Sequence, residues 1–433
     1  MPIPCSRPAS LGLVGCWTVA SAGGRILSLG CLLAALVSGA ACKRQAARGT
    51  AVSPTASSTA DPAAAGAGGR ARSIPTAQPG LFNVAFVYVG PVGDGGWTYT
   101  HDLGRRALVQ KVPGIHTAYV ENVAEGADCE HVLRSLARKR FDLIVGTSFG
   151  YMDAMETVAA EFPERAFLHI AGWKQNGKNF GNAFGAMEDM KYLAGLIAGG
   201  RAQADGRLVV GYIAPFPIPE VVRLINATAL GMKQTCPGCT MDVRWINAWV
   251  DPIREQEAAE SLFAAGADVV VTGADTTLPL SVATQKGRYA IGYDSPTACD
   301  VAKERCLTST YWRWEVVYTD VVQALRAGAW KPGAIYGDAQ SGLVGLSGFS
   351  EGEVPNPNIP SAVVEQVRTI LGELRAGRFS RFDVFAGPLR DQTGRTVLAA
   401  GQKPTQSDLL GLSGCSVCMS FLVEGIRGTL PRK

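Results

Sequence analysis

The sequence is poor in the residues on which most catalytic and metal sites depend. Only 4 of its 433 residues are histidine, and it lacks the H-E-x-x-H pattern of zinc proteases. His101 stands beside Asp102 and Arg105 at an expected helix start, where capping and ion pairing explain these residues better than acid–base chemistry. We therefore expect a protein that is not an enzyme, with no catalytic residue, no cofactor and no histidine-based metal site.

Charged residues are also scarce, and neither sign dominates. They make up 18% of the chain, with 41 Lys and Arg against 37 Asp and Glu, for a formal net charge of +4. The basic residues are scattered among acidic ones, so nothing favours nucleic-acid binding. The 47% hydrophobic content, 51 Gly and 24 Pro fit a globular α/β protein, and the length fits two cores.

Long apolar runs are absent after residue 42, so we expect a soluble body without a membrane-spanning helix. The one long run, residues 26–41, follows Arg25 and has the length of a signal-peptide core. Its end, Ser-Gly-Ala-Ala before Cys42, resembles a bacterial lipobox in which Gly39 replaces the usual leucine. Residues 1–42 are thus predicted to export the protein to the periplasm or cell surface, where Cys42 carries a lipid anchor to the membrane. An ordinary secretory signal with a coincidental cysteine is the alternative.

Residues 43–80 consist mainly of Ala, Gly, Ser, Thr and Pro, with few large apolar side chains. Such a segment buries too little surface to offset the entropy lost on ordering. We predict a flexible tether between the anchor and the body.

From residue 82 onward, short apolar runs alternate with amphipathic stretches, first in one series and then in a second. The first series predicts strands at 83–89, 117–120, 143–146 and 167–170 and helices at 105–111, 130–138 and 152–162. The second predicts strands at 208–213, 241–246, 269–271 and 290–293 and helices at 219–234 and 252–265. Continuous apolar strands that alternate with helices are typical of parallel sheets covered on both faces.

The repeat predicts two Rossmann-like lobes, residues 81–203 and 204–310, with helix 191–202 at the end of the first. Residues 311–433 would complete the lobes, with a helix at 361–376 and strand pieces at 382–389 and 397–398, and the tail from residue 334 is expected to return to the first lobe. In open parallel sheets ligands bind beyond the carboxyl ends of the strands, so the site is expected in the cleft between the lobes.

The first strand runs into a glycine-rich turn, residues 90–97, that ends in Trp97. Its glycine spacing fits neither the dinucleotide fingerprint nor the P-loop, although a cofactor-dependent α/β enzyme that uses this turn is an alternative. Trp97 at a strand end suggests a ligand contact, or else packing within the turn.

Trp249 and Asp275 follow strands of the second series and are expected to face the same cleft as Trp97. Two indole rings and one acceptor suit a flat heterocycle with N–H groups. The alternative for Asp275 is to cap the next helix. Phe149 and Phe216 also stand at strand ends, and each belongs either to the core or to the pocket.

Eleven cysteines are present, of which Cys5, Cys16 and Cys31 lie in the segment removed on export. Three close pairs favour disulfides in an oxidising compartment. The pairs are Cys236 with Cys239, Cys299 with Cys306, and Cys415 with Cys418. A zinc site built from the two C-x-x-C pairs, or a redox motif, is the alternative.

Several long motifs resemble the basic-membrane-protein (BMP) family of substrate-binding proteins for ABC importers, and within it the purine-binding members. The motifs are FVYVGPVGDGGWTYTHDLGRRAL, TSFGYM, GYIAPFPIPEVVRLINA, WINAWVDP, QSDLLG and FLVEGIRGTLP, spread over residues 82–430. The resemblance implies the type I periplasmic-binding-protein fold, a monomeric receptor, and an importer permease as partner. A sensory receptor of the same fold is the alternative role.

The resemblance also implies a ligand and its contacts. Adenine is held in the purine-binding relative by two tryptophans and an aspartate, which correspond by motif to Trp97 in GDGGW, Trp249 in WVDP and Asp275 in GADT. The neighbourhood GADT differs from the His-Thr-Asp-Ser of that relative, which affects pocket size or hydrogen bonding. Nucleoside-binding members carry Asp-x-Ser-Phe-Asn after the first strand, and this pattern is absent here.

Overall fold

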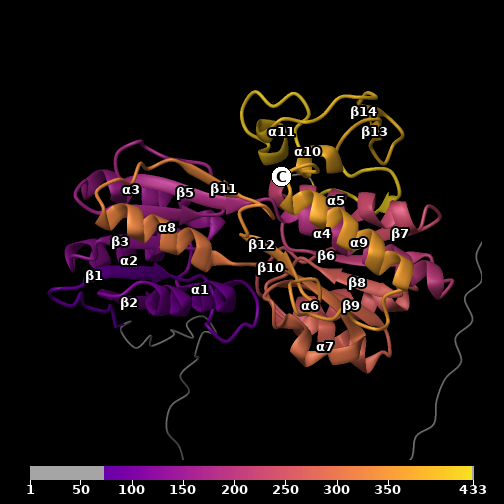
Figure 1. Cartoon of the computed structure of the whole chain (residues 1–433), viewed down its shortest axis with the longest axis horizontal. Helices are drawn as coiled ribbons and strands as arrows, with labels where there is room; N and C mark the ends of the chain where they lie inside the picture. Colours follow the sequence, from indigo (N-terminus) through magenta and orange to yellow (C-terminus); the bar gives the residue numbers. More distant parts are fainter. Residues whose placement is uncertain (1–72, 432–433) are drawn as a thin grey trace, which may run out of the picture. The chain divides into compact units, whose positions relative to one another are not determined.

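The computed structural model describes residues 73–431, so Cys42 and the expected signal segment lie outside it. The described residues form two β-sheets, each covered by helices on both faces (Figure 1). The predicted α/β architecture with parallel-dominated sheets is confirmed. Across residues 73–431, no helix combines the length and the apolar character required to span a membrane.

The first sheet is entirely parallel and has the strand order β11-β5-β4-β3-β1-β2. Its strands are β1 (Phe82–Val87), β2 (Ile115–Val120), β3 (Leu143–Gly146), β4 (Ala166–Ile170), β5 (Phe180–Gly185) and β11 (Ala334–Gly337). Its helices are α1 (Trp97–Lys111), α2 (Ala127–Arg138), the 3-10 turn η1 (Phe149–Tyr151), α3 (Met152–Glu161) and α8 (Trp314–Arg326). Alternate residues of β1 lie on opposite faces of this sheet. Val84 and Phe86 belong to the apolar cluster on one face, and Ala85 and Val87 to the cluster on the other.

The second sheet has the order β12-β10-β9-β8-β6-β7-β15, and only the β10–β12 pair is antiparallel. Its strands are β6 (Val209–Ala214), β7 (Thr240–Trp245), β8 (Val269–Thr272), β9 (Tyr289–Asp294), β10 (Cys306–Trp312), β12 (Val344–Leu346) and β15 (Ile426–Arg427). Its helices are α4 (Met187–Ala204), α5 (Pro219–Thr235), α6 (Pro252–Ala264), α7 (Leu278–Gln285), η2 (Ala298–Val301), η3 (Lys303–Arg305) and α9 (Ser361–Arg375).

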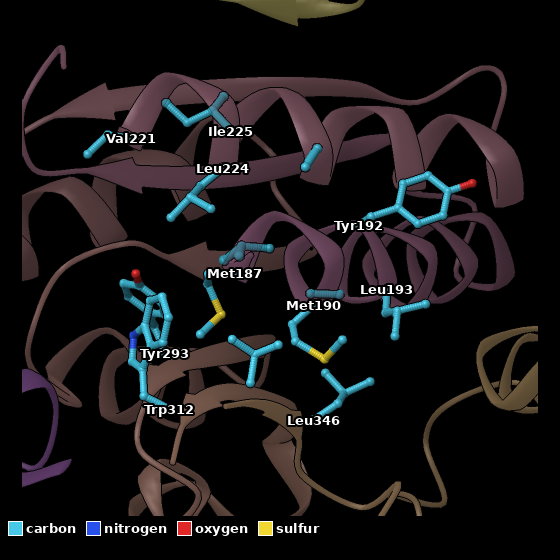
Figure 2. Close-up of a cluster of buried hydrophobic side chains, with 14 of the residues drawn as sticks. Met187, Met190, Tyr192, Leu193, Val221, Leu224, Ile225, Tyr293, Trp312 and Leu346 are labelled. Carbon is cyan, nitrogen blue, oxygen red and sulfur yellow. The ribbon is translucent and has the colours of Figure 1, made fainter. Parts of the chain in front are cut away.

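Helix α4 belongs to the second sheet, whereas the sequence assigned it to the first lobe. It packs against α5 and against β6, β8 and β10, so the chain leaves the first sheet directly after β5. Nearly every α4 side chain is buried, and a helix that is buried all round shows no single apolar face that would reveal which sheet it covers. Figure 2 shows Met187 and Met190 of α4 beside Leu224 of α5, with Trp312 and Leu346 of the sheet below them.

Glycines allow α4 and α5 to approach closely. A Cβ atom at Gly195 would lie 2.1 Å from the carbonyl oxygen of Thr228, and one at Gly231 would lie 2.0 Å from that of Tyr192. The helix backbones therefore touch where larger residues would hold them apart.

The C-terminal segment packs mainly on the second lobe, contrary to the expectation that it returns to the first. Only β11 joins the first sheet, and α9, α10 (Arg381–Val384) and α11 (Gln406–Leu410) contact α4 or α5 (Figure 1). A small hairpin of β13 (Leu389–Arg390) and β14 (Thr396–Leu398) lies between α10 and α11 in the chain. The strand predicted at 382–389 was largely wrong, because a capping box between Ser380 and Asp383 starts a helical turn there.

The end of the expected tether contacts the first lobe. Ile74 and Ala77 pack against the cluster formed by α2 and α3, and Lys139 donates a hydrogen bond to the Ile74 carbonyl. The chain is thus held from about residue 74, several residues before the boundary expected at 80.

Because α4 and α5 are so close, we expect one added methyl group between them to lower the stability of the protein. Gly195→Ala should lower the free energy of unfolding by about 1–3 kcal/mol, because its Cβ overlaps the Thr228 carbonyl and the two backbones must separate. Gly372→Ala is the matched control, since Gly372 is exposed in α9 with no atom within 4 Å of the added Cβ, and it should stabilise by about 0.5–1 kcal/mol. Urea unfolding of both variants tests this, and equal stabilities would contradict it.

Candidate functional site

A pocket of about 480 Å³ lies at the carboxyl ends of the strands in both sheets. The first lobe contributes Val89, Trp97, Ser148, Phe149 and Ala171. The second contributes Tyr212, Glu220, Val221, Leu224, Trp249, Gly273, Asp275 and Tyr293. Strands β1 and β3 flank the switch point of the first sheet, and β6 and β8 flank that of the second, which explains why residues after these strands meet here.

The glycine-rich turn after β1 is shaped by Asp94. Its carboxylate accepts hydrogen bonds from the backbone N–H groups of Gly96, Thr98 and Tyr99, each at 2.9 Å. These are donors that an unoccupied helix N-terminus would offer to a phosphate group. The turn therefore holds α1 in place and does not resemble a phosphate-binding loop.

Trp97 is both a pocket residue and part of an aromatic cluster. Its indole Nε1 donates a hydrogen bond of 2.6 Å to the Thr147 carbonyl, which fixes the ring. The edges of the ring meet Trp312 and Trp314, with ring centroids 6.2 and 5.6 Å away. Trp97 thus lines the pocket while it packs against residues outside its own turn, and its contact with a ligand stays a prediction.

His101 is buried in the same cluster, where sequence analysis expected capping and ion pairing. It stacks on Trp314 at 4.6 Å, and its Nδ1 lies 2.5 Å from the Tyr318 hydroxyl. Burial lowers the pKa of His101 well below its usual range. The expected ion pair does form, but between Asp102 and Arg105, whose Oδ1 and Nε atoms lie 2.6 Å apart.

Trp249 lines the pocket from the loop after β7, with Phe216 against it. The two rings meet edge to face with centroids 5.0 Å apart. Phe216 itself is not among the pocket residues, so the structure brings together Trp97, Trp249, Asp275 and Phe149 and leaves Phe216 as the neighbour that supports Trp249.

Asp275 stands in the loop after β8 and does not cap the next helix. Helix α7 begins at Leu278 with Thr277 at its N-cap. Within residues 73–431, no group donates a hydrogen bond to the Asp275 carboxylate. Burial raises the pKa of Asp275 well above its usual range, and the neighbouring carboxylates Asp294 and Asp94 raise it further.

The backbones of the two lobes touch beside this carboxylate. A Cβ atom at Gly96 would lie 1.9 Å from the Asp275 carbonyl oxygen. One at Gly95 would lie 3.2 Å from the Thr277 side chain. Glycine at position 96 is therefore what allows the turn after β1 to reach the loop after β8.

Among the pocket residues that were not predicted from the sequence, three carry an aromatic or charged side chain: Tyr212 in β6, Glu220 in α5 and Tyr293 in β9. Each lies inside a regular element, where its type fits a core position or a helix start equally well. The expectation that residues after strands carry the site could not find them.

The pocket wall is supported by a buried lysine. Lys191 of α4 donates a hydrogen bond of 2.8 Å to the Thr272 carbonyl, and its Nζ lies 3.8 Å from the centre of the Tyr293 ring. Burial lowers its pKa, and the charge of Asp294 opposes this shift. Asp294 in turn accepts a hydrogen bond of 3.1 Å from Trp312 Nε1.

The cysteines form the three disulfides that the spacing favoured. They are Cys236–Cys239, Cys299–Cys306 and Cys415–Cys418. Cys129 is free and buried. Between residues 73 and 431 no group of three or more His, Cys, Asp or Glu side chains is arranged to hold a metal ion.

Comparison with known proteins identifies the family. Residues 81–372 match the Bmp family, described as ABC transporter substrate-binding protein PnrA-like. The chain belongs to this family. Its members are extracytoplasmic solute-binding proteins and not enzymes, so the expected class is confirmed.

Two relatives and one solved structure illustrate the likeness. A purine-binding protein of Brucella abortus (strain 2308) is 35% identical over 350 residues, which cover 81% of this chain and 94% of the relative. A candidate ABC transporter glucose-binding protein of Haloferax volcanii is 36% identical over 285 residues, 66% of this chain and 70% of the relative. The crystal structure of an ABC transporter solute-binding protein from Aeropyrum pernix K1 shares the fold, with a TM-score of 0.60, 19% identity and coverage of 69% and 92%.

The role of Lys191 in this binding protein leads to a prediction. Lys191→Met should lower the free energy of unfolding by about 2–3 kcal/mol, because the buried Thr272 carbonyl loses its donor and Asp294 its nearby cation. Lys233→Met is the control, since Lys233 also donates to a backbone carbonyl, that of Pro237, but in an exposed position. Its stability should change by less than about 0.5 kcal/mol. Thermal and urea unfolding measure both, and equal losses would contradict a special role for Lys191.

Proposed function

We propose that the protein captures a purine base, adenine or a close analogue, outside the cytoplasm and delivers it to the permease of an ABC importer. The observation that carries the proposal is the pocket itself: Trp97 and Trp249 line it from opposite lobes together with the unpartnered carboxylate of Asp275. Aromatic faces favour a flat ring, and an ionised or protonated carboxyl group bonds well to ring N–H groups and exocyclic amines.

The composition of the pocket supports a heterocycle over a sugar. Besides the two tryptophans, the lining includes the aromatic side chains of Phe149, Tyr212 and Tyr293. The Haloferax relative is described for glucose, a ligand covered with hydroxyl groups, each of which requires a partner when buried. The Brucella relative is described for purines, which an aromatic pocket suits better.

The charges around the pocket support a neutral or cationic ligand. Asp275 and Glu220 line it, and no Lys or Arg does so among the described residues. Burial raises the pKa of Glu220 to about 7, and the charge of Arg223 opposes this shift. An anionic nucleotide would face these carboxylates without a compensating cation.

Export, the tether and the lipid anchor at Cys42 complete the proposed role, because a receptor that feeds a permease must stay near the membrane. Residues 1–72 lie outside the described structure, so lipidation of Cys42 stays a prediction from sequence.

The ligand assignment is tested by calorimetry with adenine, guanine, hypoxanthine, xanthine, their nucleosides and glucose. Adenine should bind, and Asp275→Asn should weaken it at least about tenfold, because a charge-assisted hydrogen bond becomes a neutral one. Asp320→Asn on the exposed face of α8 is the control and should bind like the wild type. Failure of every purine to bind, or tight binding of glucose alone, would sink the proposal.

The contact at Gly96 predicts that binding needs this close approach of the lobes. Gly96→Ala should weaken adenine binding at least about tenfold, because the added Cβ overlaps the Asp275 carbonyl. Gly93→Ala, in the same turn with no atom within 4 Å of its Cβ, should have no effect. Unchanged affinity in the Gly96 variant would show that the ligand binds without this contact.

A further inference from the structure

A second cavity of about 560 Å³ adjoins the aromatic pocket, and we call it the side compartment. Phe149, Ala171 and Glu220 line both cavities, so they form a shared wall. Ala171 holds this place with a φ of 71°, a left-handed conformation that is costly for a residue other than glycine. The two cavities therefore lie on either side of these three residues.

Arg223 lines the side compartment and has an unused donor. The side chain is 1% exposed, and its Nε donates to Glu188 across 3.2 Å. Its Nη2 has no hydrogen-bond partner within the described part of the chain. A buried donor without a partner is costly, and such groups in native proteins usually await water or a ligand.

Glu220 supplies an acceptor in the same compartment. It lies in the first turn of α5, one turn before Arg223 on the same helix. No donor within residues 73–431 bonds to its carboxylate. Arg223, with its unpaired Nη2, and Glu220, with its unpaired carboxylate, thus line the same compartment.

The C-terminal segment closes the far side of the side compartment. Leu410 and Gly411, at the end of α11, line it. Gly411 has a φ of 62°, and a Cβ there would lie 2.5 Å from the ring of Pro219, so α11 is seated directly against the start of α5. The segment after α9 therefore contributes to a cavity and does more than cover the second lobe.

The charges in and behind the side compartment select against ionic groups. Among the described residues that line it, Arg223 is the cation and Glu220 the carboxylate, and Glu188 pairs with Arg223 from behind. An anionic substituent would be repelled by the carboxylates, and a cationic one by the guanidinium. A neutral group that both donates and accepts, a hydroxyl or a carboxamide, fits both free partners.

We propose that the side compartment is a second subsite of the same binding site, which takes a neutral hydroxyl- or amide-bearing substituent on the ring ligand. Arg223 Nη2 donates to this substituent, and the Glu220 carboxylate accepts from it. The inference rests on the proposed purine function, which it extends from bare bases to bases with a polar side arm.

The test uses the purified protein and calorimetry with adenine and four derivatives. The derivatives carry a hydroxyethyl or a propyl group at N9 or at the exocyclic nitrogen, so the two members of each pair differ only in a hydroxyl in place of a terminal methyl group. We expect at least one hydroxyethyl compound to bind at least about tenfold tighter than its propyl partner, since one well-made hydrogen bond to a charged group has that effect.

Two variants locate the effect. Glu220→Leu should bring the ratio of the two affinities close to one, whatever happens to adenine itself. Glu257→Leu, at an exposed position of α6, should leave the ratio unchanged.

The outcomes separate the two proposals. Equal affinities within both pairs, with adenine bound, would overturn the subsite and leave the purine function standing. A hydroxyl preference that survives in Glu220→Leu would also overturn the subsite, because the hydroxyl would then bind elsewhere. No binding by any of the five compounds would overturn both.

Discussion

The approach of the Gly96 backbone to the Asp275 carbonyl is the constraint on which the site depends. Where a Cβ would come within 1.9 Å of a carbonyl oxygen, only glycine permits the contact. Asp94 fixes the turn that delivers Gly96, because its carboxylate accepts the free N–H groups at the start of α1. The same turn ends in Trp97, whose bond to the Thr147 carbonyl orients the indole. Helix capping, lobe contact and the aromatic wall are thus consequences of one short segment.

The second lobe places negative charge where the ligand must supply donors. The carboxylate of Asp275 accepts no hydrogen bond from residues 73–431, burial raises its pKa, and the neighbouring carboxylates raise it further. Lys191 offsets part of this charge from behind the Tyr293 ring but does not reach the pocket. A ligand with N–H groups lowers the cost of burying the carboxylates, and an acceptor-rich ligand does not. Selectivity in this pocket therefore depends on the carboxylates that lack a hydrogen-bond donor as much as on the aromatic contacts.

The sequence predicted the α/β repeat, the three disulfides and the strand ends where the pocket lies, because these follow from local patterns. Trp97, Trp249, Asp275 and Phe149 come after strands, and parallel sheets bring such positions to one edge. Tyr212 and Tyr293 lie within strands, where an aromatic residue gives no sign of which cavity it faces. The sequence could not show which sheet α4 packs against, because the helix is buried on every side. Gly195 and Gly199 on one face indicate only that another helix comes close.

Family membership limits the ligand less than the pocket does. A relative described as purine-binding and one described as glucose-binding match this chain at 35% and 36% identity, so similarity of this degree does not decide between the two descriptions. Function resides in a site more than in the fold that carries it, and several residues of this pocket stand in the loops after strands. In this chain those ends carry tryptophan, phenylalanine and aspartate, with no lysine or arginine in the lining of the aromatic pocket as described. These side chains by themselves favour a flat ring that carries hydrogen-bond donors.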